Sequence, residues 1–176
     1  MKKNPTNMYM GQFEAPLLKP NVVAMKSFHL GRESFLVTAS KEAHESMERA
    51  NVIESFKIIE KELIGLSPTV ITSYLTQEKL GSSISVNDVK AIDTLEFPTT
   101  TLLAVLDLDG TNSRLRIFSF NPSRAEPHVE LSSKTFDHGI FKNMHSFKHQ
   151  GIKHLVLSGS VDKNNKVITI QVRFRR

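Results

Sequence analysis

The chain has 176 residues, a formal net charge of +5, and 39% hydrophobic and 23% charged residues. This length suits a single domain with one ordinary core, and the composition is that of a globular rather than a disordered chain. No run of about 18 apolar residues occurs, so the sequence predicts neither a membrane-spanning helix nor a Sec-type signal. The absence of cysteine excludes disulfides, Cys-ligated zinc and a thiol nucleophile. We expect a cytoplasmic protein, with non-Sec secretion into a host cell as the alternative.

The first part of the chain is predicted to form an arm and a hairpin. Residues 1–20 contain three prolines and no apolar periodicity, which predicts a flexible arm outside a single domain at 21–176. Two β-rich runs follow, from Val22 to Phe28 and from Ser34 to Ala39. They flank Gly31, so the pattern predicts a hairpin that turns there.

The next segment is predicted to be helical. Ser40 is a candidate N-cap, and apolar residues then recur at every third or fourth position over residues 41–64. These residues are Ala43, Met47, Ala50, Ile53, Phe56, Ile59 and Leu63. A second, shorter helix is expected between Ser67 and Gly81, and a third short helix begins at Ser85 with a capping box.

After Pro98 the apolar pattern changes from helical to alternating. Two apolar runs, Leu102 to Leu106 and Leu115 to Phe120, flank turn residues around Gly110, which predicts a second hairpin. A strand is expected at 129–131, and a short helix or loop at 140–149.

The last predicted strand, from Val167 to Phe174, has the clearest alternation. It pairs with Leu155–Leu157 through a turn at 163–166. The residues expected to face the core are Ile168, Ile170, Val172 and Phe174. The chain is therefore predicted to be α+β, with an antiparallel sheet in the C-terminal half packed against two or three helices.

The positive charge is concentrated at the C-terminal end. From residue 134 onward, nine lysines and arginines occur with only Asp137 and Asp162. Such a set attracts phosphates through a salt-sensitive interaction that does not depend on base sequence, and the nearby Phe141, Phe147 and Phe174 could stack on bases. We expect a protein that binds nucleic acid or an acidic protein surface, through Lys148, Lys153, Lys163, Lys166, Arg173, Arg175 and Arg176. The alternative is a solvated basic face without a ligand.

The segment Leu106-Asp107-Leu108-Asp109-Gly110-Thr111 resembles the first motif of the haloacid-dehalogenase phosphatases. The resemblance implies that Asp107 is a nucleophile and Asp109 an acid/base, with Ser158 in the second motif. Residues 104–117 are also similar to the phosphate-binding strand pair of hexokinase-type sugar kinases, with Asp109 in place of a glycine. A turn of Asp and Gly is equally what a hairpin uses.

The segment Leu157-Ser158-Gly159-Ser160 resembles the Leu-Ser-Gly-Cys element of glutamine-deamidating toxins of the cytotoxic-necrotizing-factor type. The resemblance places Ser160 where the family has its nucleophilic cysteine, and Gln171 or Arg173 where it has a histidine. A replaced cysteine would also explain the cysteine count of zero. The alternative function is therefore a small effector- or toxin-type enzyme, or an inactive relative.

His145 and His149 are four residues apart, downstream of Asp137 and His138. On a helix the two histidines would share a face, where they could bind a metal or act as an acid/base pair. No third ligand occurs at a defined spacing, so we expect solvated histidines, no metal and no cofactor. A third class of function, a structural or inhibitory partner protein without chemistry, fits the same composition.

Overall fold

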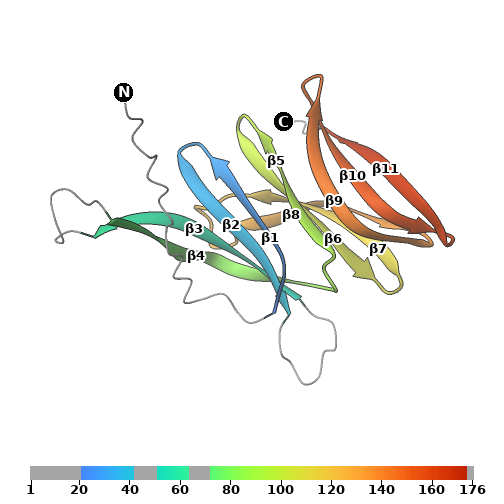
Figure 1. The fold of residues 1–176 in the computed structure, drawn as a ribbon, viewed down its shortest axis with the longest axis horizontal. Coiled ribbons are helices and arrows are strands. Elements are labelled where there is room, and N and C mark those ends of the chain that lie inside the picture. The colour runs from blue at the N-terminus through green and yellow to red at the C-terminus, as the bar shows by residue number, and fades with distance from the viewer. Residues whose placement is uncertain (1–20, 42–50, 64–71, 174–176) are drawn as a thin grey trace, which may run out of the picture.

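The computed structural model describes residues 21–41, 51–63 and 72–173, and this part of the chain is all-β (Figure 1). Eleven antiparallel strands form three sheets, and within these ranges no residue is helical. Accordingly, none of the described elements is a helix long and apolar enough to cross a bilayer.

Each sheet is a meander, in which strands that follow one another in sequence are hydrogen-bonded neighbours. Sheet A contains β1 (Val22–Leu30), β2 (Glu33–Lys41), β3 (Asn51–Leu63) and β4 (Thr72–Val86). All of its neighbouring strands are antiparallel, and the β1–β2 turn has Gly31 at φ 64°. This positive φ is the backbone conformation that glycine adopts without strain.

Sheet B is a second four-stranded meander. It contains β5 (Ala91–Phe97), β6 (Thr100–Asp109), β7 (Asn112–Phe120) and β8 (His128–Phe136). Sheet C follows with three strands, β9 (Gly139–His149), β10 (Ile152–Val161) and β11 (Asn164–Val172).

Sheet B lies between the other two sheets, and its strand β6 is buried on both faces, whereas β8 is mostly exposed. One apolar cluster joins it to sheet A, with Phe35 and Val37 packed near Leu103 and Val105. A second cluster joins its opposite face to sheet C. The continuous apolar run of β6 follows from this position, because successive residues of a strand point to opposite faces and here both faces are covered.

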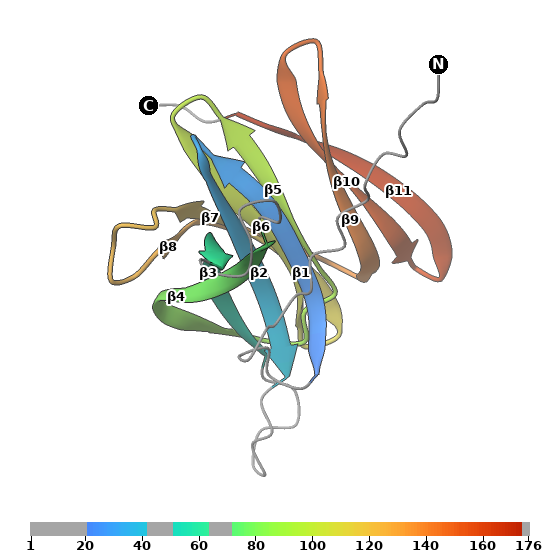
Figure 2. The same ribbon diagram turned by 60° about the vertical axis from the view of Figure 1, so that its left-hand side comes forward.

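The three sheets spread outward from their first strands. Strand β1 lies against β5, and β5 lies against β9, whereas β4, β8 and β11 are at the far edges (Figures 1 and 2). The inner edges of all three sheets therefore come together in one region.

The α+β prediction is wrong. The predicted helix at 41–64 is replaced in its described part by β3, where Ile53 faces sheet B and Phe56 lies on the opposite face. Both side chains are buried, at 0% and 2% exposure. Both faces of β3 are covered, so apolar residues are found on both of them. Two such residues can then be three positions apart, which is also the spacing along the apolar face of a helix. The residues Ala43, Met47 and Ala50 lie outside the described residues.

The two shorter predicted helices are also wrong where they are described. Strand β4 includes Gly81, the predicted end of the second helix, and Ser85, the predicted cap of the third. Val89 and Ile92 do face the core, but from the β4–β5 connection and from β5 rather than from a helix. Residues 140–149, expected as a short helix or loop, form most of β9. The predicted arm at 1–20 lies outside the described residues.

The predicted hairpins are confirmed, except that the turn expected at 163–166 lies at 162–163 and residues 164–166 belong to β11. Strands β1 and β2 turn at Gly31, and β6 and β7 turn at Gly110, which has a φ of 62°. The strand expected at 129–131 is part of β8. In β11 the residues Ile168, Ile170 and Val172 pack against the core as predicted, while Phe174 lies outside the described residues.

Candidate functional site

The inner edges of the three sheets meet at the carboxylate of Asp93 on β5, which is 2% exposed. The ammonium of Lys26 on β1 lies 2.6 Å from Oδ1. The backbone N–H of Ser146 on β9 donates to Oδ2 at 2.5 Å, and the N–H of Thr94 donates to Oδ1 at 2.8 Å. A single carboxylate therefore joins sheets A, B and C.

Burial and hydrogen bonding act in opposite directions on the pKa of the Asp93 carboxyl group. Burial raises the pKa, because the charged form loses water. The bonds from Lys26 and from the N–H groups of Ser146 and Thr94 outweigh this effect, and the pKa lies below its ordinary value of 3.8. At neutral pH the ionised Asp93 therefore neutralises Lys26.

A polar cleft of about 350 Å³ opens beside this junction. Its walls come from β1, β5, β9 and β10: Lys26, Ser27, Thr94, Glu96, Ser146, Phe147, Lys148 and Lys153. Lys26 is engaged by Asp93. Within the described residues, neither Lys148 nor Lys153 has a carboxylate at ion-pair distance.

Lys148 of β9 is directly opposite Lys153 of β10 in the register of sheet C. The Cβ atoms of directly opposed residues lie about 4.5–5.5 Å apart, and like charges in these positions repel each other. An anion between the two ammonium groups removes that repulsion. This lysine pair is therefore a candidate anion-binding position at the wall of the cleft.

The preceding register pair, Phe147 and His154, points to the opposite face of the same hairpin. The two rings stack with centroids 5.0 Å apart and an interplanar angle of 17°. The ring of His149 approaches that of His154 at 6.5 Å, and Phe147 is 39% exposed. Partly exposed rings beside cations provide a surface on which nucleic-acid bases stack.

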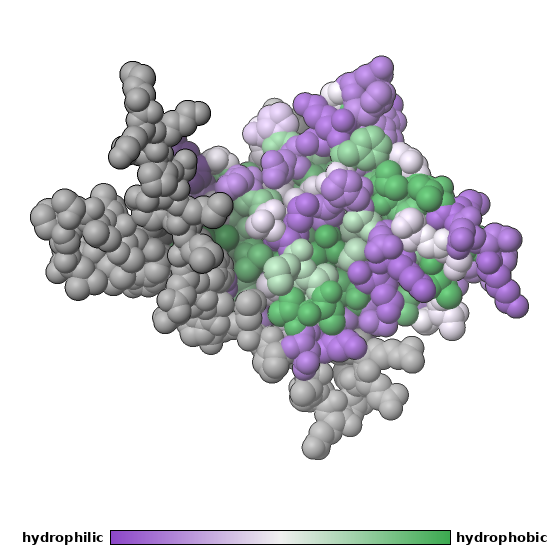
Figure 3. All heavy atoms as spheres, in the orientation of Figure 1, coloured by the Kyte–Doolittle hydropathy of each residue, from purple (hydrophilic) through white to green (hydrophobic). Residues whose placement is uncertain are grey.

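The remaining predicted basic residues fall into two groups at opposite ends of sheet C. Arg173 follows the residue that pairs with Lys153, so it lies near the β9–β10 turn. Lys163 lies in the β10–β11 turn instead, and Lys166 follows near the start of β11, opposite Gly159. Figure 3 shows hydrophilic residues at both ends of this sheet, with apolar residues between them. Of the other predicted cations, Arg175 and Arg176 lie outside the described residues.

The Asp107 carboxylate, the nucleophile of the phosphatase resemblance, is fully buried. The guanidinium of Arg114 donates to both of its oxygens, at 3.0 and 2.8 Å, and Arg116 lies 3.6 Å away. The hydrogen bond to Asp107 raises the pKa of Arg114. Asp109 is exposed beside the β6–β7 turn, where Thr135 donates to it at 3.3 Å. A buried carboxylate neutralised in this way offers no free oxygen to a substrate.

Ser160, the candidate of the deamidase resemblance, lies on β10 opposite Asn165 of β11 and Ile140 of β9. Gln171 is opposite His154, near the other end of the sheet. At about 3.3 Å per residue, His154 lies roughly 20 Å along the strand from Ser160. Among the described residues, neither residue directly opposite Ser160 is a histidine, and His138 lies nearby in the β8–β9 turn.

The histidines considered as an acid/base or metal pair are separated along β9. His145 and His149 share a face of the strand, but four residues of a strand span about 13 Å. Asp137 and His138 form the β8–β9 turn instead, and His145 Nδ1 lies 3.5 Å from Asp93. Among the described residues, no three acidic or histidine side chains are grouped closely enough to hold a metal ion.

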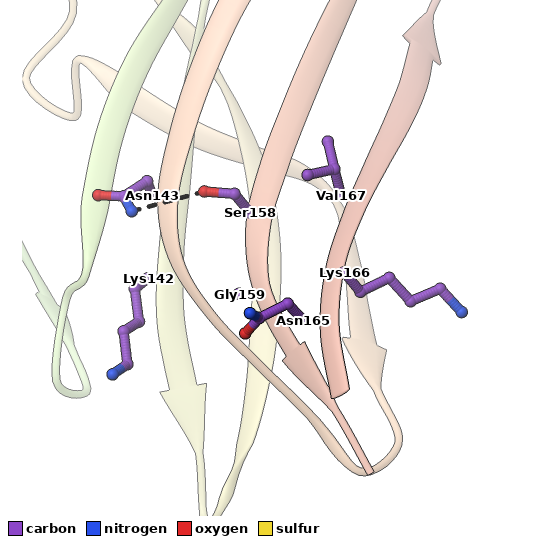
Figure 4. Close-up of a pocket in the computed structure, with 7 residues that line it drawn as sticks. All are labelled: Lys142, Asn143, Ser158, Gly159, Asn165, Lys166 and Val167. Atoms are coloured by element: carbon purple, nitrogen blue, oxygen red, sulfur yellow. Dashed lines mark hydrogen bonds between the residues drawn. The ribbon is translucent and has the colours of Figure 1, made fainter. Parts of the chain in front are cut away.

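A second cleft, of about 360 Å³, lies on sheet C near the β10–β11 turn (Figure 4). Asn143 donates to Ser158 across it at 3.5 Å, while the side chains of Lys142 and Lys166 point away from each other. A bulge in β9 brings the backbone of Ile140 and Phe141 close to Gly159, where a Cβ atom would lie 2.2 Å from a carbonyl oxygen. Close packing of backbones thus explains the glycine of the Leu-Ser-Gly-Ser segment.

A buried Ser55–His128 contact joins sheet A to sheet B. Ser55 Oγ hydrogen-bonds His128 Nε2, and both residues are buried, at 1% and 8% exposure. Burial lowers the pKa of His128 to about 4. Its Nδ1 has no hydrogen-bond partner, so no acidic residue orients this pair as in a catalytic triad.

The sequence analysis did not identify Lys26, Asp93 or Ser146 as site residues. A signal was available for Asp93, which interrupts the apolar residues of β5, and for Lys26, which interrupts the inward row of β1. A charge at an inward position needs a partner. Their pairing nevertheless depends on the contact between sheets A and B.

The chain was compared with models of known protein families and with curated proteins, and neither comparison found a match.

Proposed function

We propose that this protein binds single-stranded nucleic acid with the β9–β10 hairpin of sheet C. The lysine pair, Lys148 and Lys153, contacts phosphates, and the ring pair, Phe147 and His154, stacks on bases. Arg173, at the adjacent end of β11, adds a further cation.

One observation carries this proposal: two neighbouring register positions place opposed lysines on one face of the hairpin and stacked rings on the other. Lysines alone would suit any anion, including an acidic protein surface. Exposed rings favour nucleic acid, because every base has a face on which an aromatic side chain can stack. The geometry around Asp107 and Ser160 gives the enzyme alternative no comparable support.

Fluorescence anisotropy with a labelled oligothymidine tests the proposal. We expect the Lys148→Ala/Lys153→Ala variant to bind more weakly. The matched control, Lys134→Ala/Lys142→Ala, removes the same charge at a distance from the ring pair and should bind like the unmodified protein. Phe147→Ala should cost about 1–3 kcal/mol of binding free energy, the range for loss of one base stack.

Two results would contradict the proposal. The first is an equal loss of affinity in both double-lysine variants, which would show a nonspecific charge effect. The second is unchanged affinity in Phe147→Ala together with equal competition by polyglutamate, which would favour an acidic protein partner.

A further inference from the structure

Sheet C has one strand fewer than its neighbours. In sheets A and B the third strand is covered by a fourth, since β3 pairs with β4 and β7 pairs with β8. In sheet C the third strand is β11, and within the described residues only β10 pairs with it. The outer edge of β11 thus borders the position where each of the other two sheets has its fourth strand.

This edge has few of the features that protect edge strands from pairing. All nine residues of β11 are in continuous register with β10, without a bulge or a proline. Val167 is 67% exposed on it. Long, regular edges with exposed apolar residues are sites at which a further strand adds.

The opposite edge of the same sheet is closed by side chains. Asp93 accepts the N–H of Ser146, and Ser113 Oγ accepts the N–H of Phe141 at 2.7 Å. Both contacts engage backbone N–H groups on the edge of β9 that faces away from β10. The difference between the edges shows that β11, and not β9, is the accessible pairing edge of sheet C.

Cross-strand charge pairs join the third and fourth strands of the complete sheets. In sheet A, Glu54 of β3 lies 2.6 Å from Lys79 of β4, and in sheet B, Arg116 of β7 lies 2.6 Å from Glu130 of β8. The charged side chain of β11 is Lys166, for which the described residues provide no carboxylate. If a strand were added beside β11, an acidic side chain opposite Lys166 would form the cross-strand ion pair that the other two sheets have.

We propose that β11 accepts an extended acidic segment of another polypeptide as the fourth, antiparallel strand of sheet C. Main-chain hydrogen bonds hold the segment, and a carboxylate opposite Lys166 selects it. A second copy of the chain fits less well, because antiparallel β11–β11 pairing would bring Lys166 and Arg173 of both copies to one seam. This interface is separate from the lysine and ring pairs of the β9–β10 hairpin.

A labelled ten-residue peptide of alternating valine and threonine, with a glutamate at each end, is a direct probe. Amide hydrogen exchange should slow at alternate residues of Asn164–Val172 when this peptide is added. The same peptide with two consecutive N-methylated residues at its centre should neither bind nor protect, because both of its edges lose a donor. A peptide with lysine at each end should bind about two- to fivefold more weakly, as expected for loss of one cross-strand charge pair.

A charge reversal tests the role of Lys166. Lys166→Glu should reverse the preference between the glutamate and lysine peptides, and the control Lys142→Glu should leave it unchanged. Three results would overturn the proposal: no protection of β11, equal binding of the N-methylated peptide, or protection of β11 without peptide in a dimer detected by sedimentation. The nucleic-acid assay uses other residues, so either proposal can fail alone.

Discussion

Asp93 on β5 and Lys26 on β1 form a 2.6 Å ion pair at the point where three sheets converge. Asp93 is also bonded to the backbone of β9, so this pair fixes the position of sheet C relative to sheets A and B. The cleft and the β9–β10 hairpin are built on that junction. The stability of the junction and the proposed binding are therefore linked.

We predict that Asp93→Asn lowers the free energy of unfolding by about 1–3 kcal/mol. The amide cannot neutralise Lys26, and it replaces a charge-assisted hydrogen bond to Ser146 with a neutral one. Urea denaturation at neutral pH measures the loss. A variant as stable as the unmodified protein would contradict the role assigned to this carboxylate.

The contribution of Asp93 should depend on pH in a defined direction. Its pKa is lowered in the folded protein, so its contribution is complete above the ordinary value of 3.8 and is lost as pH falls through the lowered pKa. The stability difference between the protein and Asp93→Asn should therefore shrink only in strong acid. A difference that already disappeared near pH 6 would contradict this account.

Protonation of His128 should lower the stability of the fold at a higher pH than protonation of Asp93 does. Burial lowers its pKa from 6.5 to about 4, so the unfolded chain takes up a proton before the folded protein does. The stabilisation is complete above about pH 6.5 and is lost between pH 6.5 and 4, by about 3 kcal/mol. His128→Phe combined with Ser55→Ala should remove this part of the pH dependence, which denaturation curves at several pH values will show.

Gly159→Ala should destabilise the protein although the φ of Gly159 is not positive. The added Cβ would meet the backbone of Ile140 and Phe141, which cannot move as a flexible side chain can. We expect a loss of about 1–3 kcal/mol, the usual cost of overpacking. Ser158→Ala is the matched control at the adjacent position. Equal stability of both variants would show that the backbone of the β9 bulge can shift at little energetic cost.

Glycine at position 163 should stabilise the β10–β11 turn. Lys163 has a φ of 66°, a conformation that costs a side chain with a Cβ atom roughly 1–2 kcal/mol. We expect Lys163→Gly to raise the thermal midpoint relative to Lys163→Ala, because both remove the charge but only glycine relieves the strain. Thermal denaturation followed by circular dichroism distinguishes them, and an equal midpoint would mean that this turn carries no strain.

The sequence predicted those parts of the fold that depend on local signals. Glycines between β-rich apolar runs identify the hairpins at Gly31 and Gly110, and alternation identifies the inward face of β11. Strand β3 could not be recognised in the same way. Its two faces are both buried, and the resulting spacing of Ile53 and Phe56 is also that of a helix.

The candidate site was predictable only in part. The concentration of lysines near the C-terminal end is visible in the sequence, but strand register decides which of them meet. Lys148 and Lys153 come together because a two-residue turn at Gln150 and Gly151 pairs them. The partnership of Lys26 with Asp93 crosses between sheets and has no local signature.

The salt dependence of oligothymidine binding tests the central claim most directly. For single strands, each lysine–phosphate contact contributes about 0.7 to the slope of log affinity against log salt concentration. The account predicts a salt-dependent affinity whose slope falls by about 1.4 in Lys148→Ala/Lys153→Ala and stays unchanged in Lys134→Ala/Lys142→Ala. A slope in Lys148→Ala/Lys153→Ala equal to that of the unmodified protein would contradict it.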